Sequence, residues 1–138
     1  MPHTKTWKES GLIRTFIGEI TGTEIIESNF EIHGDLRFDE IDYVINDFSN
    51  IDSCIISEDE LRILSISDEV ATHANKHIKI AIIANRDEII ELAKAYCELF
   101  DQAIYDTEIF SSIDEGQAWV NALTTKYNPE NLKQYGRL

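Results

Sequence analysis

Apolar and β-branched residues gather in short runs along the chain, and a longer amphipathic stretch follows each of them. The runs cover residues 12–20, 43–48, 78–84 and 103–110. Runs of this length that are rich in Ile, Val, Phe and Thr are typical of β-strands. The most apolar run, residues 78–84, is expected inside a sheet, whereas the last one alternates with acidic residues as an edge strand does.

Each predicted strand is followed by a helix-start signal, in which a Ser, Thr or Asn stands three positions before a Glu: Thr21 and Glu24, Ser57 and Glu60, Asn85 and Glu88, and Ser112 and Glu115. In such a capping box the cap side chain accepts a free helix N–H, and the Glu reaches back to the backbone of the cap. We therefore predict a helix after every strand. The first covers residues 22–33 and ends at Gly34 in a left-handed conformation.

Apolar residues at helical spacing predict the face that each helix turns toward the sheet. These faces are, in chain order, Ile25, Ile26 and Phe30; Ile63, Ile66, Val70 and Ala74, with Leu61 and Leu64 beside them; Ile89, Ile90, Ala93, Tyr96, Cys97 and Phe100; and Ala118, Trp119 and Leu123. Residues 49–56, before the second helix, include Ser49, Asn50, Asp52 and Ser53 and are expected to form a polar loop that holds Cys54.

Strand and capped helix alternate at intervals of about 30 residues, which indicates βα units and a mostly parallel sheet. A short strand around Trp7 is predicted to turn through Ser10 and Gly11 into the first run as a hairpin. The element order is then ββαβαβαβα. We expect a single domain over residues 1–125 and an irregular tail over residues 126–138, which contain Asn128-Pro129 and few apolar side chains.

Charge changes this picture by excluding some partners. The chain of 138 residues has a formal net charge of −14, and between Glu19 and Glu69 there are 15 acidic side chains against Arg37 and Arg62. Such a surface repels phosphate backbones and anionic lipid headgroups. No apolar run approaches the roughly 20 residues that span a bilayer. Nucleic acid and membrane insertion are therefore not expected, and a basic protein is a better partner.

The compartment is predicted from the first residues and from the cysteines. Residues 1–7 have no apolar stretch of the kind that a secretion signal needs. Two thiols, Cys54 and Cys97, are most often small buried apolar groups in a reducing environment. We expect a cytoplasmic protein.

Several kinds of chemistry find no support. His73 and His77 have the spacing of two metal ligands on one helix face, but no further ligands can be named, and a helix C-terminus attracts His for its own reasons. The acids between Asp35 and Asp42 lack the alternating pattern of a calcium loop. Phosphate-binding glycine motifs and nucleophile motifs are absent. We therefore predict no cofactor, no metal and no enzymatic activity.

Short blocks of sequence, combined with this element order, resemble the STAS superfamily. They are residues 18–21 (Gly-Glu-Ile-Thr), 35–38 (Asp-Leu-Arg-Phe), 43–49, 80–83 and 110–120. Within this superfamily, the chain is similar in particular to bacterial stand-alone domains related to anti-sigma-factor antagonists. The resemblance implies a mixed sheet of four or five strands with helices mainly on one face. It also implies a role in protein–protein docking or, in relatives with lipid-transfer character, in holding an apolar ligand.

The resemblance further implies an Asp-Ser-Ser-Gly block in which a phosphorylated Ser switches partner binding. Counted from Asp47, the matching stretch is Ile-Ile-Ser-Glu, and only Ser57 survives. A phosphate there would meet the acids of residues 58–60, with Arg62 as the nearest cation. We interpret Ser57 as a helix cap.

The leading hypothesis is therefore a non-catalytic regulatory domain that binds a protein partner or a second copy of itself. The alternative is a domain that binds or senses a small apolar, lipid-like ligand in a core cavity. In α/β folds, binding residues gather beyond the carboxyl ends of the strands. That rule selects Asp47, Ser49, Ser57 and Asn85 as candidates, with Thr21 and Ser111 nearby.

Overall fold

The computed structural model describes residues 3–71, 78–99 and 106–126. In chain order the elements are β1 (His3–Trp7), β2 (Gly11–Thr21), α1 (Gly22–His33), the short 3-10 helix η1 (Leu36–Glu40), β3 (Tyr43–Ile55), α2 (Glu58–Ala71), β4 (Lys79–Ile83), α3 (Asp87–Leu99), β5 (Asp106–Phe110) and α4 (Ile113–Lys126). The predicted order ββαβαβαβα is confirmed. Except for Lys126, the predicted tail lies outside the described residues.

The strands form one five-stranded sheet in the order β1-β2-β3-β4-β5. β1 pairs antiparallel with β2, and all the other neighbours pair in parallel. The mixed, mostly parallel sheet is therefore confirmed, with β4 inside it and β5 at its edge. Because β3 lies at the centre, both of its faces are available for packing against helices.

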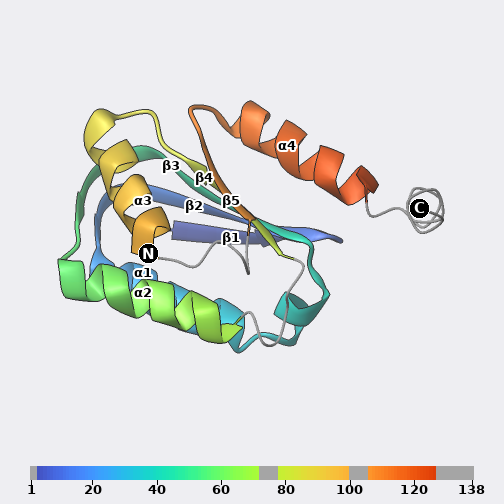
Figure 1. The fold of residues 1–138 in the computed structure, drawn as a ribbon, viewed down its shortest axis with the longest axis horizontal. Coiled ribbons are helices and arrows are strands. Elements are labelled where there is room, and N and C mark those ends of the chain that lie inside the picture. Colours follow the sequence, from blue (N-terminus) through green and yellow to red (C-terminus); the bar gives the residue numbers. More distant parts are fainter. Residues whose placement is uncertain (1–2, 72–77, 100–105, 127–138) are drawn as a thin grey trace.

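Helices cover the two faces of the sheet unequally (Figure 1). On one face α1, α2 and α3 pack through residues such as Ile25, Leu64 and Ile89. On the other face lies α4, where Val120 is fully buried against Ile45 and Ile83. The expectation that the helices lie mainly on one face is confirmed.

β3 is longer than the sequence pattern predicted, which corrects the expected loop over residues 49–56. It runs to Ile55, and its second half pairs with residues 17–21 of β2. Cys54 is therefore on a strand. Backbone pairing with β2 provides the hydrogen bonds that make a polar stretch a strand, whereas a single sequence shows only the polarity.

A bulge bends the paired ends of β2 and β3. The register between them shifts between Thr15 and Ile17 and again between Gly18 and Glu19. Gly18 has φ of 74°, a left-handed value that glycine adopts without steric cost. Beyond this bend, β2 and β3 extend past the ends of β4 and β5 as a two-stranded arm, which we define as residues 17–21 and 50–55.

The helix starts agree with three of the four predicted caps. Thr21, Ser57 and Ser112 each accept a hydrogen bond from the backbone N–H of the Glu three residues later. The Asn85 prediction is wrong, because α3 begins at Asp87 and Glu88 pairs with Arg86. The left-handed end at Gly34 is also wrong, since this residue has φ of −86°.

Three of the predicted helix faces are wrong in part. In α4, Ala118 is exposed, and Val120 is buried against the sheet instead. α1 buries Ile25, Ser28, Asn29 and Ile32 and leaves Phe30 59% exposed. α2 buries Leu61 and Leu64, which were expected beside the stripe, together with Ser65, Asp68 and Ala71. The stripe residues Ile63, Ile66 and Val70 are exposed. The expected core stripe of α2 therefore points outward; its fourth member, Ala74, lies outside the described residues.

Candidate functional site

The four predicted site residues do not form one cluster. Asp47 is the last residue of β3 that pairs with β4, and Ser49 lies two residues further along β3. Asn85 follows the end of β4. Ser57 lies two residues beyond the end of β3 at Ile55. The six residue steps of strand from Ser49 to Ile55 alone span roughly 20 Å, at about 3.3 Å per residue. The arm therefore separates the strand ends that the α/β rule expects to find together.

Asp47 is held by its own strand. Its carboxylate is buried, and it accepts hydrogen bonds from the Ser49 backbone N–H at 3.0 Å and from the Ser49 hydroxyl at 2.6 Å. The hydrogen-bonding capacity of this carboxylate is therefore used by neighbouring groups of its own strand. Asn85, by contrast, is exposed.

Ser57 caps α2, as the sequence indicated. Its Oγ accepts from the Glu60 backbone N–H at 3.1 Å, and its own N–H donates to Glu60 Oε1 at 2.9 Å. The Ser57 backbone bond, followed by contacts with Thr23 and the Ser57 hydroxyl, lowers the pKa of Glu60. Thr23 of α1 donates to the same carboxylate at 3.2 Å, so the starts of α1 and α2 are joined.

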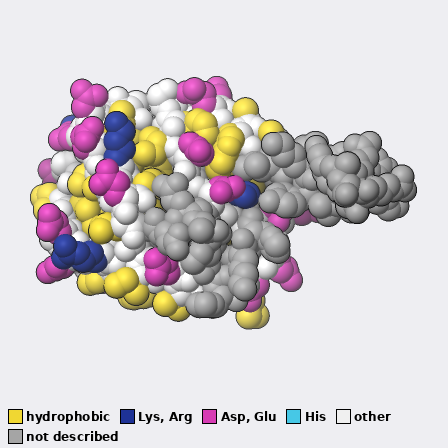
Figure 2. All heavy atoms as spheres, viewed as in Figure 1, with side chains coloured by type: hydrophobic (Ala, Val, Ile, Leu, Met, Phe, Trp, Pro, Cys, Tyr) yellow, Lys and Arg dark blue, Asp and Glu magenta, His cyan; other side chains and the backbone are white. Residues whose placement is uncertain are grey.

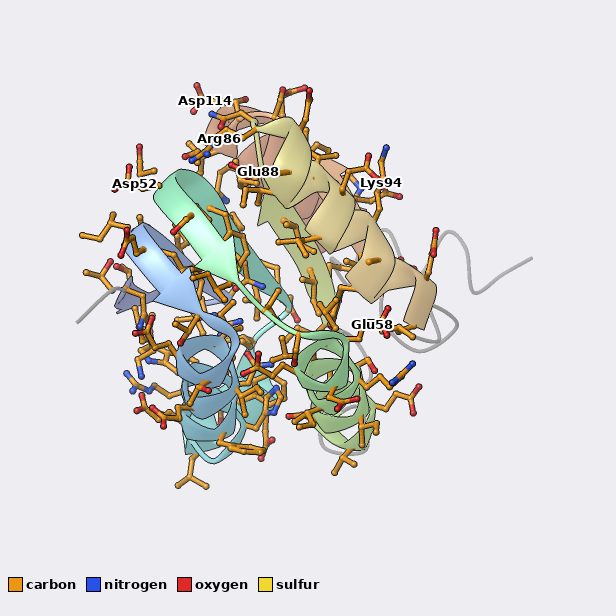
Figure 3. The ribbon with its side chains drawn as sticks, turned by 90° about the vertical axis from the view of Figure 1, so that its left-hand side faces the viewer. Asp52, Glu58, Arg86, Glu88, Lys94 and Asp114 are labelled. Atoms are coloured by element: carbon orange, nitrogen blue, oxygen red, sulfur yellow. The ribbon has the colours of Figure 1, made fainter. Side chains whose placement is uncertain are left out.

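The surroundings of Ser57 are acidic. Glu58 and Asp59 are almost fully exposed in the first turn of α2, where Figure 3 labels Glu58 at the end of the helix. Arg62 already pairs with Asp59 at 3.3 Å. This environment agrees with a capping role and opposes the addition of a phosphate.

An apolar strip runs along the outside of the α1–α2 pair. We define it as Phe30 of α1 with Ile63, Ile66 and Val70 of α2, whose exposed fractions are 59%, 45%, 58% and 64%. The helices lie side by side, joined at one end by Thr23 and Glu60 and further along by a 3.3 Å contact between His33 Nδ1 and Ser67 Oγ. Figure 2 shows yellow side chains along the lower edge of the molecule, where Figure 1 places α2.

Helical geometry places the strip at the seam between the two helices. Phe30 stands seven residues after Thr23, on the edge of α1 that faces α2, and Ile63 and Val70 flank Ser67 at spacings of four and three residues. The strip is thus a continuous outer surface. Exposed apolar side chains that gather in this way commonly mark a binding surface.

A buried polar cluster lies beneath the same two helices. Arg14 of β2 is only 4% exposed, and its guanidinium donates to Asn46 Oδ1 at 2.8 Å, to Ser28 Oγ at 3.0 Å and to Asn29 Oδ1 at 2.8 Å. Burial lowers the pKa of Arg14 to about 10, while Asp68 acts in the opposite direction. Arg14 therefore stays cationic at neutral pH.

Asp68 of α2 is the acidic member of this cluster. Its carboxylate accepts from Tyr96 of α3 and from Asn29 Nδ2 at 3.4 Å, and it lies 3.3 Å from His33 Nε2. Burial, and then the charge of Asp68, raise the pKa of Tyr96 well above its ordinary value. The phenol therefore keeps its proton and serves as a donor, which ties α3 to α2.

A cavity of about 100 Å³ lies between these helices and the sheet. Its polar lining is the cluster just described: Arg14, Asn29, His33, Asn46, Asp68 and Tyr96. The rest of its wall is apolar and is provided by β3, β4 and the three helices, with Val44, Phe48, Leu64, Ile80 and Ala93 among the side chains.

The sequence pattern missed Arg14 because it sits within an apolar, β-branched run. A signal was nevertheless present: Leu12, Arg14 and Phe16 share one strand face, so a charge placed between two core residues had to be buried. Ser28 and Asn29 escaped notice for the related reason that their polarity suggested an outward face.

The part of the chain that the structure describes offers little support for metal binding or for thiol chemistry. Within residues 3–71, 78–99 and 106–126, no three His, Cys, Asp or Glu side chains gather as metal ligands. His73 and His77 lie outside these residues. Burial is the main cause that raises the pKa of Cys54 and of Cys97, which makes both thiols less reactive. None of the described helices is long and apolar enough to cross a bilayer.

No protein-family model matches the chain, and no curated protein matches its sequence significantly. Solved structures do match. The anti-sigma factor antagonist SpoIIAA in its unphosphorylated form is 7% identical, with a TM-score of 0.58 over 87% of this chain and 96% of its own. The Bacillus cell fate determinant SpoIIAA in its phosphorylated form is 10% identical, with a TM-score of 0.53 over 86% and 98%.

A protein of the DUF3478 family with a SpoIIAA-like fold, from Shewanella loihica, is 15% identical over 86% of this chain and 91% of its own, with a TM-score of 0.48. At identities this low, the first two similarities establish the fold. The STAS-like fold expected from the sequence is therefore confirmed.

Proposed function

We propose that this chain is a non-catalytic regulatory domain that docks a protein partner on the apolar strip of α1 and α2. The observation that supports the proposal most directly is the exposure of Phe30, Ile63, Ile66 and Val70 on adjoining helices. Its STAS-like fold is shared with a protein named as an anti-sigma factor antagonist, which is a regulator that acts on another protein. Of the four predicted candidates, Ser57 lies next to a docking helix, as the cap of α2.

The strip is not needed for folding. α2 already buries a full face toward the sheet through Leu61, Leu64 and Ala71, so a second apolar stripe adds exposed surface without adding core. Exposed residues of this size favour association by removing apolar area from water, at about 25 cal/mol per Å². A docking role accounts for a stripe that the core does not use.

The charges nearby favour a basic partner over a second copy. Exposed Glu27, Glu58 and Asp59 stand on the same two helices, and the whole chain carries a net charge of −14. Two copies would bring like charges together, whereas a partner with an apolar ridge between Lys and Arg side chains would complement them. We further propose a reducing compartment such as the cytoplasm, since Cys54 and Cys97 are not joined by a disulfide.

Binding of designed peptides tests this function. Two amphipathic helical peptides share one Leu-rich face and differ in their flanks, which are Lys in one and Glu in the other. We expect the Lys peptide to shift backbone amide resonances of α1 and α2 in NMR spectra, and to bind more weakly as salt is raised. The Glu peptide should bind at least tenfold more weakly.

Variants locate the surface. Ile66→Gln and Phe30→Gln should each weaken binding of the Lys peptide severalfold, and the fold should survive because both side chains are exposed. Ile55→Gln is the matched control, because Ile55 is 72% exposed and lies outside the strip. Equal losses at Ile55 and Ile66 would contradict the proposal. If the protein forms concentration-dependent dimers that Ile66→Gln abolishes, the molecule that docks on the strip is a second copy of this chain and not a basic partner.

The cavity supports a second function, the binding of a small ligand in the core. Its volume of about 100 Å³ is smaller than the roughly 150 Å³ cavity that accommodates benzene in an engineered protein. A full acyl chain is therefore too large, and the ligand of this second function is a small molecule. Saturable binding of benzene, measured by NMR shifts of cavity-lining methyl groups, tests this function.

A further inference from the structure

Arg14 is a buried cation that has no carboxylate partner. Among the residues that the structure describes, no carboxylate oxygen lies within ion-pair distance of its guanidinium, and the side chains that bond it, Ser28, Asn29 and Asn46, are all neutral. Buried charges in folded proteins are normally paired with an opposite charge. The nearest acid in this network, Asp68, is reached through Asn29.

The guanidinium also retains donors. Its Nε and Nη1 are occupied, but Nη2 donates to no oxygen of the described residues. The amide nitrogen of Asn46 likewise has no acceptor there, although its Oδ1 accepts from Arg14. Both side chains line the cavity, so spare N–H donors and a positive charge without a direct carboxylate partner belong to the wall of one cavity.

The remainder of that wall is apolar. Ile80 and Ile82 of β4, Leu64 of α2 and Ala93 of α3 are buried around it. A ligand that fits the whole space therefore needs an anionic, planar head for Arg14 and a short hydrocarbon tail. A carboxylate accepts charge-assisted hydrogen bonds from a guanidinium, and here Nη2 can donate one such bond while the Asn46 amide donates a second.

We propose that the core cavity binds a short-chain monocarboxylate, with its carboxylate on Arg14 and Asn46 and its alkyl chain among the residues of β4, α2 and α3. The inference deepens the second proposed function and is independent of partner docking. The cavity volume of about 100 Å³ is smaller than that of the benzene-binding cavity, so about six non-hydrogen atoms, the size of butyrate, are the upper limit for the ligand. Phosphate and sulfate have no tail to fill the apolar part.

Asp68 does not compete with this ligand for Arg14. Its carboxylate is engaged by Tyr96, Asn29 and His33. The Nη2 edge of the Arg14 guanidinium is therefore available to an anion. The negative charge of Asp68 is balanced by the groups that donate to its own carboxylate.

Titration with defined ligands tests the proposal. Butyrate is added to labelled protein, and the Nε–Hε signal of Arg14 is followed by NMR together with the methyl signals of Leu64 and Ile80. We expect saturable shifts in all three. Butyrate should bind about tenfold or more tightly than 1-butanol, which lacks the charge-assisted bonds, and also more tightly than hexanoate, which is too long.

Variants separate the head of the ligand from its tail. Ala93→Leu fills the cavity and should abolish butyrate binding while the fold is retained; Ala118→Leu, an exposed site on α4, is the matched control. Arg14→Met should also abolish binding, and because it removes a buried bonding centre its folding is checked by circular dichroism. Ala93→Leu keeps the test valid if Arg14→Met does not fold.

Each other outcome overturns the inference in a distinct way. If benzene binds and butyrate does not, the cavity is a purely apolar site and the second proposed function survives alone. If neither binds, both fail. Acetate that binds as tightly as butyrate would show that the apolar wall selects nothing. Butyrate that binds Ala93→Leu unchanged would place its site elsewhere.

Discussion

Replacing Ser57 by Ala should destabilise the protein by about 1 kcal/mol, within the range of roughly 0.5–2 kcal/mol found for helix caps. The structure supports the middle of this range. The substitution removes the 3.1 Å bond from the Glu60 N–H to Ser57 Oγ, but the Ser57 N–H can still donate to Glu60. The site is exposed, so water replaces the lost bond and no desolvation cost is added. For a domain of this size the loss corresponds to roughly 3–5 °C in Tm.

The assay is urea unfolding followed by the fluorescence of Trp7 and Trp119, compared with thermal unfolding by circular dichroism. Ser57→Asp should restore about half of the lost stability, because Asp is a good cap but adds a charge beside three acids. Thr21→Ala, at the equivalent cap of α1, is the matched control and should behave like Ser57→Ala.

The same variants test what Ser57 does. Peptide binding on the apolar strip should be unaffected by Ser57→Ala if the residue is a cap, and Ser57→Asp, which adds an acid beside Glu58 and Asp59, should not weaken binding of the Lys peptide. Unchanged stability in Ser57→Ala, or weaker docking in Ser57→Asp, would refute this reasoning and restore a switching role.

Three further predictions follow from the core, the bulge and the surface acids. Tyr96→Phe removes a donor to the buried Asp68 carboxylate and should cost about 1–3 kcal/mol in urea unfolding, whereas Tyr43→Phe, on the other face of the sheet, should cost less. Gly18→Ala should cost about 1–2 kcal/mol, because a Cβ there meets no atom within 4 Å and only the left-handed backbone is strained; an equal loss in Gly18→Asn would contradict this cause. Glu60 and Glu115 have folded pKa values below the ordinary 4.5, so the stability they contribute is present above that value and is lost as pH falls through the lowered pKa. The urea midpoint should therefore decline below about pH 4.5, and the decline should be shallower in the double variant Glu60→Gln, Glu115→Gln; an identical slope would show that other groups control it.

Local patterns predicted the elements but not all of their faces. The capping pairs at Thr21, Ser57 and Ser112 depend on residues three positions apart, and a single sequence displays that spacing directly. Which side of α2 faces the sheet depends on what lies opposite. Asp68 turns inward because Asn29 of α1 and Tyr96 of α3 donate hydrogen bonds to its carboxylate. Ser65 also turns inward, and its hydroxyl is satisfied within α2, where it donates to the Arg62 carbonyl oxygen at 2.9 Å. The apolar stripe then turns outward.

The candidate site was limited by the same dependence on distant partners. Asp47 was correctly placed on a strand, whereas Ser49 was expected in a loop and lies within β3. The extension of β3 that separates both residues from Ser57 arises from pairing with β2. The cluster around Arg14 joins residues of β2, α1, β3, α2 and α3. No spacing rule within one segment can assemble it, because its members meet only when the sheet has formed.

The arm has a consequence for solubility. A pair of strands that extends past its neighbours leaves two backbone edges on which a foreign strand could add. On the β3 edge, Arg86 donates to the carbonyl oxygens of Ile51 at 2.9 Å and Asp52 at 2.6 Å, and Figure 3 labels Arg86 and Asp52. On the β2 edge, the bulge at Gly18 bends the strand and disrupts a straight template. Along these two edges, where no neighbouring strand of the described chain pairs with the arm, a guanidinium and a glycine thus make the backbone a poorer template for a foreign strand.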